Sequence, residues 1–277
     1  MDRTSMRHQL ARPIFVVGSP RSGTTVVGRY LASSKSVLDL GEYRGFFLAY
    51  KVVPEFFERV PAPFQAQYIR KLADFTRRVA EEQAHVRRSS WYCDHTPLNL
   101  LVAREIARDV PRALFILMVR HHAGVIQSLA RSYRDGFEWA GDTLRKRAEI
   151  YRQFYSNVTA LPTLRTIAVS YDGLCSAPTE TLNILERRLA SFGFPMEGLS
   201  RRAFVESHAT STRDRRATIG VVTRDAVHLR AIASFDAARW TRRHQRMTEE
   251  IIAPAQMLIL RLFPGALESS PPVHSPV

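Results

Sequence analysis

Residues 15–25, "FVVGSPRSGTT", combine spaced glycines, hydroxyl side chains and one arginine in a pattern suited to binding an anion. Gly18 and Gly23 enclose four residues and are followed by Thr24 and Thr25. Loops with this spacing cradle phosphate between backbone amides and a helix N-terminus. Nucleoside triphosphatases place a lysine after the second glycine to reach the β- and γ-phosphates, but this chain has Thr24. Arg21 instead offers a guanidinium fork to phosphate or sulfate oxygens. The alternative, a glycine turn that binds nothing, leaves the Ser-Gly-Thr-Thr run after Arg21 unexplained.

Three apolar runs are predicted as strands, and each is followed by a loop that could contribute to a ligand site; the first of these loops is the glycine loop. The runs are residues 13–17, 113–119 and 166–170, and the unbroken run at 113–119 is typical of a strand buried on both faces of a parallel sheet. Helical patterns alternate with these runs, which predicts right-handed crossovers between parallel strands. Ligands of such sheets bind at the C-terminal ends of the strands, and the loops after residues 17, 119 and 170 all fall there. The sequence therefore predicts an α/β fold with a central parallel sheet flanked by helices, similar to P-loop proteins.

Helices are predicted between these strands, within one domain. One follows residue 23, one spans residues 123–133, and two more are indicated by apolar residues at helical spacing. These apolar sets are Leu98, Leu101, Val102 and Ile106 after Pro97, and Leu182, Leu185, Leu189 and Phe192. We expect a flexible tail over residues 1–11, one domain over residues 12–265, and a disordered tail rich in proline and serine over residues 266–277.

The amino-acid composition limits the kinds of binding partner that the protein can have, but it does not identify one. The chain has 40 basic and 26 acidic residues, and the resulting net charge of +14 attracts anions. No basic block interleaved with aromatic residues is present, so we expect no nucleic-acid partner. The cysteines, Cys93 and Cys175, are too few for a disulfide framework or a structural zinc site. No apolar run approaches the roughly 20 residues that span a bilayer. We therefore expect a cytoplasmic protein with no membrane span and no metal; the sequence does not indicate its oligomeric state.

Together these motifs resemble sulfotransferases that use 3′-phosphoadenosine 5′-phosphosulfate (PAPS). "PRSGTT" after an apolar strand is similar to their 5′-phosphosulfate loop, and their donor has no γ-phosphate, so the missing lysine is expected. "FILMVRHHAGVIQS" resembles a second motif, in which an arginine at a strand end and a serine eight residues later bind the 3′-phosphate. This implies such roles for Arg120 and Ser128. "VSYDGLCSAPTETL" resembles a segment that places a tyrosine near the donor, here Tyr171.

The resemblance covers residues 12–195 and implies PAPS as co-substrate without a metal. The implied donor-binding residues are Arg21, Ser22, Gly23, Thr24, Thr25, Arg120, Ser128 and Tyr171. Residues 211–220 are the best candidate for the family's C-terminal loop over the donor. One departure concerns the residue after Arg120, which is usually acidic in the family. This chain has His121 and His122, which we interpret as residues that fill surface loop positions.

The catalytic base has two candidates. Glu42 in "DLGEYRG" resembles the Gly-Glu segment of tyrosylprotein sulfotransferases, with the same separation from the loop arginine. This implies Glu42 as base and Arg21 as a catalytic contact to the donor. His95 in "WYCDHTPLNLL" stands where related enzymes have a lysine that contacts the transferring sulfuryl group; a histidine there can donate or accept a proton. The structural alternatives are a surface or helix-capping role for Glu42, and a hydrogen-bond cluster of Asp94 and His95 at the next helix.

We therefore expect a PAPS-dependent sulfotransferase that modifies a hydroxyl of a small molecule such as a sugar, a lipid or a secondary metabolite. The alternatives are a P-loop kinase acting on a small metabolite, a tyrosine-directed sulfotransferase, a nucleotide sensor without catalysis, and a basic nucleic-acid-binding protein. Residues 42–64 are rich in aromatic side chains, which are candidates for an apolar acceptor pocket or for ordinary core.

Overall fold

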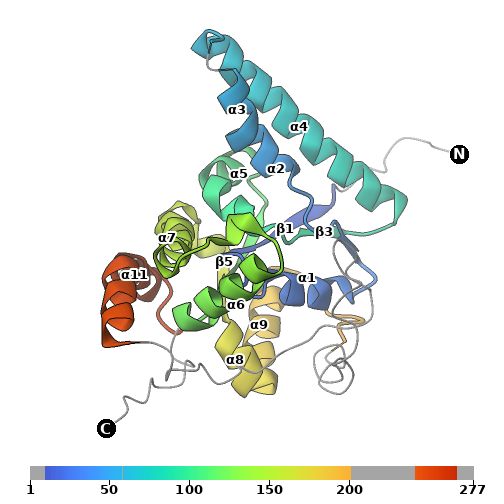
Figure 1. The fold of residues 1–277 in the computed structure, drawn as a ribbon. Coiled ribbons are helices and arrows are strands. Elements are labelled where there is room, and N and C mark those ends of the chain that lie inside the picture. Colours follow the sequence, from blue (N-terminus) through green and yellow to red (C-terminus); the bar gives the residue numbers. More distant parts are fainter. Residues whose placement is uncertain (1–9, 58, 201–240, 267–277) are drawn as a thin grey trace, which may run out of the picture.

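A five-stranded parallel sheet forms the centre of the protein (Figure 1), and the computed structural model describes residues 10–57, 59–200 and 241–266. The strands are β1 (Arg12–Gly18), β2 (Val37–Asp39), β3 (Trp91–Asp94), β4 (Leu114–Val119) and β5 (Thr166–Ser170), in the order β2-β3-β1-β4-β5. Every neighbouring pair runs parallel. The predicted α/β fold with a central parallel sheet and flanking helices is therefore confirmed. Most of both predicted tails, and the loop candidate at residues 211–220, lie outside the described residues.

Side chains of the central strands alternate between two hydrophobic cores, one on each face of the sheet. Phe15 and Val17 of β1 belong to one core, and Ile14 and Val16 belong to the other. The first core is covered by α5 (Ala103–Asp109), α6 (His122–Arg134), α7 (Leu144–Tyr155) and α11 (Arg242–Leu262). The second core is covered by α1 (Thr24–Ala32), α8 (Tyr171–Ser176) and α9 (Pro178–Ser191). The unbroken apolar runs of the sequence thus reflect burial on both faces.

The segment after β3 differs from the single helix predicted there. A 3-10 helix, η2 (Pro97–Val102), comes first and α5 follows it. The buried carboxylate of Asp94 accepts hydrogen bonds from the backbone N and Oγ1 of Thr96 and from Nδ2 of Asn99. These bonds hold the first turn close to the strand end. Because residues three apart eclipse one another in a 3-10 helix, Leu98 and Leu101 share one side of η2.

A helical arm projects from the body at the top of Figure 1. It consists of α2 (Gly45–Phe47), the π-helical turn η1 (Leu48–Val52), α3 (Val53–Phe56) and the long helix α4 (Ala62–Val86). The residues of α4 that are buried are small, namely Ala73, Thr76, Ala80 and Ala84. None of the helices in the described ranges has both the length and the apolar character needed to cross a membrane.

Candidate active site

The glycine loop leads directly into the N-terminus of α1. Gly23 has a left-handed backbone with φ of 98°, a conformation that favours glycine. A Cβ at this position would lie 2.4 Å from Cδ2 of Tyr171, so the close approach of the two segments also requires glycine. No side chain in the described part of the chain caps α1. Its first backbone amides and its dipole are therefore directed at the loop, which is the geometry of an anion-binding site.

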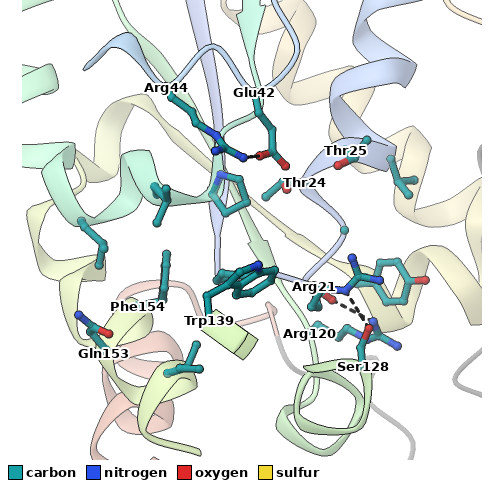
Figure 2. A pocket seen from close by; sticks show the side chains of 18 residues that line it. Arg21, Thr24, Thr25, Glu42, Arg44, Arg120, Ser128, Trp139, Gln153 and Phe154 are labelled. Atoms are coloured by element: carbon teal, nitrogen blue, oxygen red, sulfur yellow. Dashed lines mark hydrogen bonds and ion pairs between the residues drawn. The ribbon is translucent and has the colours of Figure 1, made fainter. Parts of the chain in front are cut away.

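Side chains from three adjacent strand ends meet beside this loop (Figure 2). Nε of Arg21 donates to Oγ of Ser128 at 3.0 Å, and Nη1 of Arg120 donates to the carbonyl oxygen of Arg21 at 2.9 Å. The Arg120 guanidinium lies 4.3 Å from the centroid of the Tyr171 ring. Because β1, β4 and β5 are neighbours in the sheet, residues far apart in the sequence form one cluster. We call Arg21, Arg120, Ser128 and Tyr171 the arginine cluster.

The arginine cluster brings two positive charges together, one on the buried Arg120 and one on Arg21, which stays exposed. Partial desolvation by the surrounding protein and the neighbouring Arg120 guanidinium both lower the pKa of Arg21. Nε of Arg120 is buried and has no hydrogen-bond partner among the described residues. A phosphate or sulfate group would offset the repulsion between the guanidiniums and accept from donors such as this one. Within the described ranges, no group of three or more His, Cys, Asp or Glu side chains is suited to hold a metal ion.

Helix α7 fixes the strand end from which Arg120 projects. The hydroxyl of Tyr155 donates to the carbonyl oxygen of Met118 at 2.8 Å, and that of Tyr151 donates to the carbonyl oxygen of Arg120 at 3.4 Å. Both tyrosines are fully buried. Gly124 in α6 leaves room for the guanidinium, since a Cβ there would lie 2.8 Å from Nε of Arg120. These supporting residues carry no sequence motif and were not predicted.

A cavity of about 660 Å³ opens beside the arginine cluster. The residues predicted to bind the donor that line it are Arg21, Gly23, Thr24, Thr25, Arg120, Ser128 and Tyr171. Ser22 is the exception, because it is fully buried within the loop. Glu42 and Arg44 lie on another side of the cavity, and Figure 2 shows Glu42 near Thr24. The predicted base and the predicted donor-binding residues thus share one cavity.

Glu42 belongs to the loop after β2. Hydrogen bonds with residues that follow β3 hold this loop in place. The backbone N of His95 donates to the carbonyl oxygen of Gly41 at 3.1 Å, and the backbone N of Arg44 donates to Oγ1 of Thr96 at 3.2 Å. The Glu42 carboxylate forms an ion pair with Arg44, whose Nη2 lies 3.0 Å from Oε2. Both side chains remain substantially exposed to the cavity and to solvent. A substrate group therefore has access to the carboxylate.

The side chain of His95, the second predicted base, does not line this cavity. It is buried against α1, where a Cβ on Gly28 would come within 2.4 Å of its Cδ2. Nε2 of His95 lies 3.4 Å from Oδ1 of Asp39. Burial alone would raise the pKa of Asp39, but hydrogen bonds from His95 and from the Gly41 backbone outweigh it and lower that pKa. Asp94 forms the hydrogen-bond cluster considered as an alternative, whereas the His95 side chain turns toward Asp39.

Apolar side chains form much of the remaining wall. They are Pro97, Leu98 and Leu101 of η2, Trp139 in the 3-10 helix η3 (Glu138–Ala140), and Ile150 and Phe154 of α7. Figure 2 shows Trp139 and Phe154 on the side away from Thr25. No aromatic residue of the stretch 42–64 lines the cavity. Phe46 of that stretch is core, and Phe56 and Phe64 face solvent. Pro97, Leu98 and Leu101 belong to the segment quoted around His95, whereas Trp139, Ile150 and Phe154 come from segments that no motif identified.

The interpretation of His121 and His122 as surface loop residues is wrong. His121 caps α6, with Nδ1 accepting from the backbone N of Ala123, and its own backbone N donates to Oδ2 of Asp172 at 2.6 Å. His122 packs between helices, with Nδ1 3.1 Å from Nε2 of Gln256 in α11. Burial, and to a smaller extent His121, lower the pKa of His122 to about 3. Both histidines thus stabilise the start of α6 beside the arginine cluster.

The sheet topology, the glycine loop and the paired arginines define an α/β protein with the geometry of an anion-binding site at its strand ends. The family model described as "Sulfotransferase family" matches residues 13–191. The chain belongs to the sulfotransferase family, so it is a sulfotransferase rather than a P-loop kinase. The suspected membership is confirmed at the level of the family. The comparison with curated proteins found none that matches the sequence.

Solved structures are similar to this chain at the level of the fold. The sulfotransferase domain from the curacin biosynthetic pathway is 17% identical with a TM-score of 0.53, and the match covers 89% of this chain and 98% of that chain. The sulfotransferase STF9 from Mycobacterium avium is 14% identical with a TM-score of 0.50, covering 92% of this chain and 77% of that chain. At such low identities the likeness shows the fold alone.

Proposed function

We propose that this sulfotransferase uses PAPS and transfers the sulfuryl group to a hydroxyl of an apolar small molecule. The arginine cluster beside the glycine loop is the observation that carries this proposal. Arg21 and the amides at the start of α1 suit a 5′-phosphosulfate, and Arg120 with Ser128 suits a 3′-phosphate. The buried Nε of Arg120 supports the fit, since it has no partner in the described structure. Bound PAPS supplies the activated sulfuryl group.

The protein's own part in the reaction is orientation, charge stabilisation and proton removal. Glu42 lies in the same cavity as Arg21 and Thr24, so its carboxylate can take the proton from an acceptor hydroxyl held between them. Arg44 orients that carboxylate through its ion pair. Arg21 and the amides of α1 stabilise negative charge on the phosphate side. His95, held against Asp39 outside the cavity, suits a positioning role for the loop that carries Glu42.

The wall of the cavity favours an apolar acceptor. Leu98, Leu101, Ile150 and Phe154 would bury hydrocarbon or aromatic surface, and Trp139 would stack on a flat group. Such a lining suits a lipid alcohol or an aromatic secondary metabolite better than a sugar, whose hydroxyls need polar partners. A tyrosine side chain on a peptide is the remaining alternative for the acceptor.

Transfer from donor labelled in the sulfuryl group tests the proposal. Purified protein is incubated with a panel of long-chain alcohols, phenols, sugars and tyrosine peptides, and labelled products are counted. We expect products from apolar alcohols or phenols, with Glu42→Gln slower by about 10²–10⁴-fold because it cannot accept the proton. Donor affinity should stay the same in this variant. If Glu42→Gln turns over normally while His95→Ala and His95→Lys are inactive, then His95 is the base.

A further inference from the structure

The long helix α4 presents its large side chains to solvent rather than to the body. Phe64, Tyr68, Lys71 and Phe75 follow one another at spacings of four, three and four residues, so they form one stripe. All of them are exposed, and Phe64 and Phe75 keep 66% and 63% of their surface accessible. An amphipathic helix of a globular protein ordinarily directs its apolar stripe toward the core. Here the stripe facing the body is made of small residues, and the aromatic stripe points outward.

The neighbouring helix extends this exposed surface at the end of the arm. Phe56, the last residue of α3, is 81% exposed. The ring of Phe57 contacts that of Tyr68, with centroids 4.7 Å apart, so the two helices form a continuous surface here. We call Phe56, Phe64, Tyr68, Lys71 and Phe75 the aromatic–basic face. Arg59 and Arg70, which are also exposed, flank it; the helices bring these three basic residues beside the aromatic rings, although they do not form a basic block in the sequence.

We propose that the aromatic–basic face docks the protein onto an anionic lipid surface. Aromatic side chains beside lysine and arginine are the composition of helices that lie in the interface of a bilayer. Basic residues close to such a surface each add attraction to acidic headgroups. The net charge of +14 for the whole chain draws it toward the same surface. The helix lies on the membrane in this arrangement and does not cross it.

Charge complementarity favours a lipid surface over a second copy of the chain. Pairing two aromatic–basic faces would place one surface that carries Arg59, Arg70 and Lys71 against a second surface with the same three positive charges. Like charges in contact across an interface oppose association. An acidic headgroup layer offers opposite charge to all three side chains, together with an apolar boundary that accepts the phenylalanine rings.

The arm is also joined to the loop that carries Glu42. The hydroxyl of Tyr43 donates to the carbonyl oxygen of Thr76 in α4 at 3.2 Å. A Cβ on Gly45 would lie 2.6 Å from Cγ2 of the same threonine, so the backbone of α2 rests directly on α4. Docking through α4 therefore holds the mouth of the cavity in a fixed relation to the lipid surface. The docking inference itself does not depend on the proposed donor or acceptor.

Vesicle co-sedimentation tests the inference. The full-length protein is mixed with vesicles of phosphatidylcholine alone or with one third phosphatidylglycerol, across a range of salt concentrations. We expect binding to the anionic vesicles that weakens with salt, and little binding to the neutral ones. Phe56→Ser/Phe64→Ser leaves the charge unchanged and should lower the affinity about tenfold, because two rings no longer enter the interface. Lys71→Glu should lower it about fivefold or more.

The matched control is Leu164→Ser/Met257→Ser, which removes two exposed apolar side chains, 88% and 68% accessible, from other parts of the surface. This control should bind vesicles like the wild type, and all variants should keep the wild-type unfolding temperature. The inference is overturned if the wild type ignores anionic vesicles, or if the phenylalanine double variant binds them as well as the control does. It is also overturned if sedimentation velocity shows self-association that the double variant loses, because a second copy then covers the face.

Discussion

Replacing Arg120 by alanine should change which nucleotide the protein prefers. Adenosine 3′,5′-bisphosphate and 5′-AMP differ by the 3′-phosphate, which we assign to Arg120 and Ser128. Losing a hydrogen bond to a charged group typically costs about 1.5–3 kcal/mol, which is roughly 10- to 150-fold in affinity. Arg120 also donates to the carbonyl oxygen of Arg21 at 2.9 Å, so the alanine variant loosens the loop as well. Loss of this hydrogen bond to the loop weakens the binding of both nucleotides equally, so it cancels in the ratio of their affinities.

Isothermal titration calorimetry with both nucleotides measures this ratio. We expect Arg120→Ala to lower the preference for the bisphosphate about tenfold or more. Arg44→Ala is the matched control, since it removes one positive charge from another side of the same cavity. The control should keep the wild-type ratio. An unchanged ratio in Arg120→Ala, or an equal fall in Arg44→Ala, would refute the assignment of the 3′-phosphate to Arg120.

Three further outcomes follow from the site and its supports. Gly23→Ala would place a Cβ 2.4 Å from the Tyr171 ring on a residue with a left-handed backbone. The affinity for adenosine 3′,5′-bisphosphate, measured by calorimetry, should therefore fall about tenfold or more. A near-normal affinity would contradict this geometry. Trp139→Ala should raise the KM for apolar acceptors roughly tenfold while the KM for the donor stays constant in steady-state kinetics. The fold lowers the pKa of His122 to about 3, so below about pH 6.5 the unfolded chain binds more protons than the folded one. Stability should therefore be fully present above that pH and fall as the pH drops toward 3, and thermal unfolding of His122→Gln should show a weaker decline.

The sequence was sufficient to predict the strands that carry the donor-side residues. Residues 166–170 coincide with β5, and the runs at 13–17 and 113–119 coincide with β1 and β4 within a residue or two. These strands are buried on both faces, so their apolar runs are unbroken and their ends are marked by polar loops. The strands β2 and β3 have three and four residues, and they are strands because longer neighbours pair with them. Such short segments have no periodicity of their own to read.

The site also contains residues whose positions were predictable from the sequence and residues whose positions were not. Arg21, Arg120, Ser128 and Tyr171 follow strand ends, and the order of the sheet brings strand ends together, so their meeting was predictable. The apolar wall was not predictable, because Trp139 and the lining residues of α7 reach the cavity only through the way that their helices pack. The position of His95 also depends on packing. It fits against α1 where Gly28 has no side chain, a contact between segments far apart in the sequence.

Helix α7 lines the cavity with one side and supports the end of β4 with the other, which limits how the acceptor specificity can be redesigned. Ile150, Gln153 and Phe154 face the cavity, whereas the intervening Tyr151 and the following Tyr155 bond to the end of β4. A library that varies positions 150, 153 and 154 explores new acceptors while the framework under Arg120 stays intact. Transplanting the whole helix from another sulfotransferase would exchange the acceptor wall and the support of the nucleotide site in one step. Engineers should therefore alter this helix residue by residue, with both tyrosines held constant.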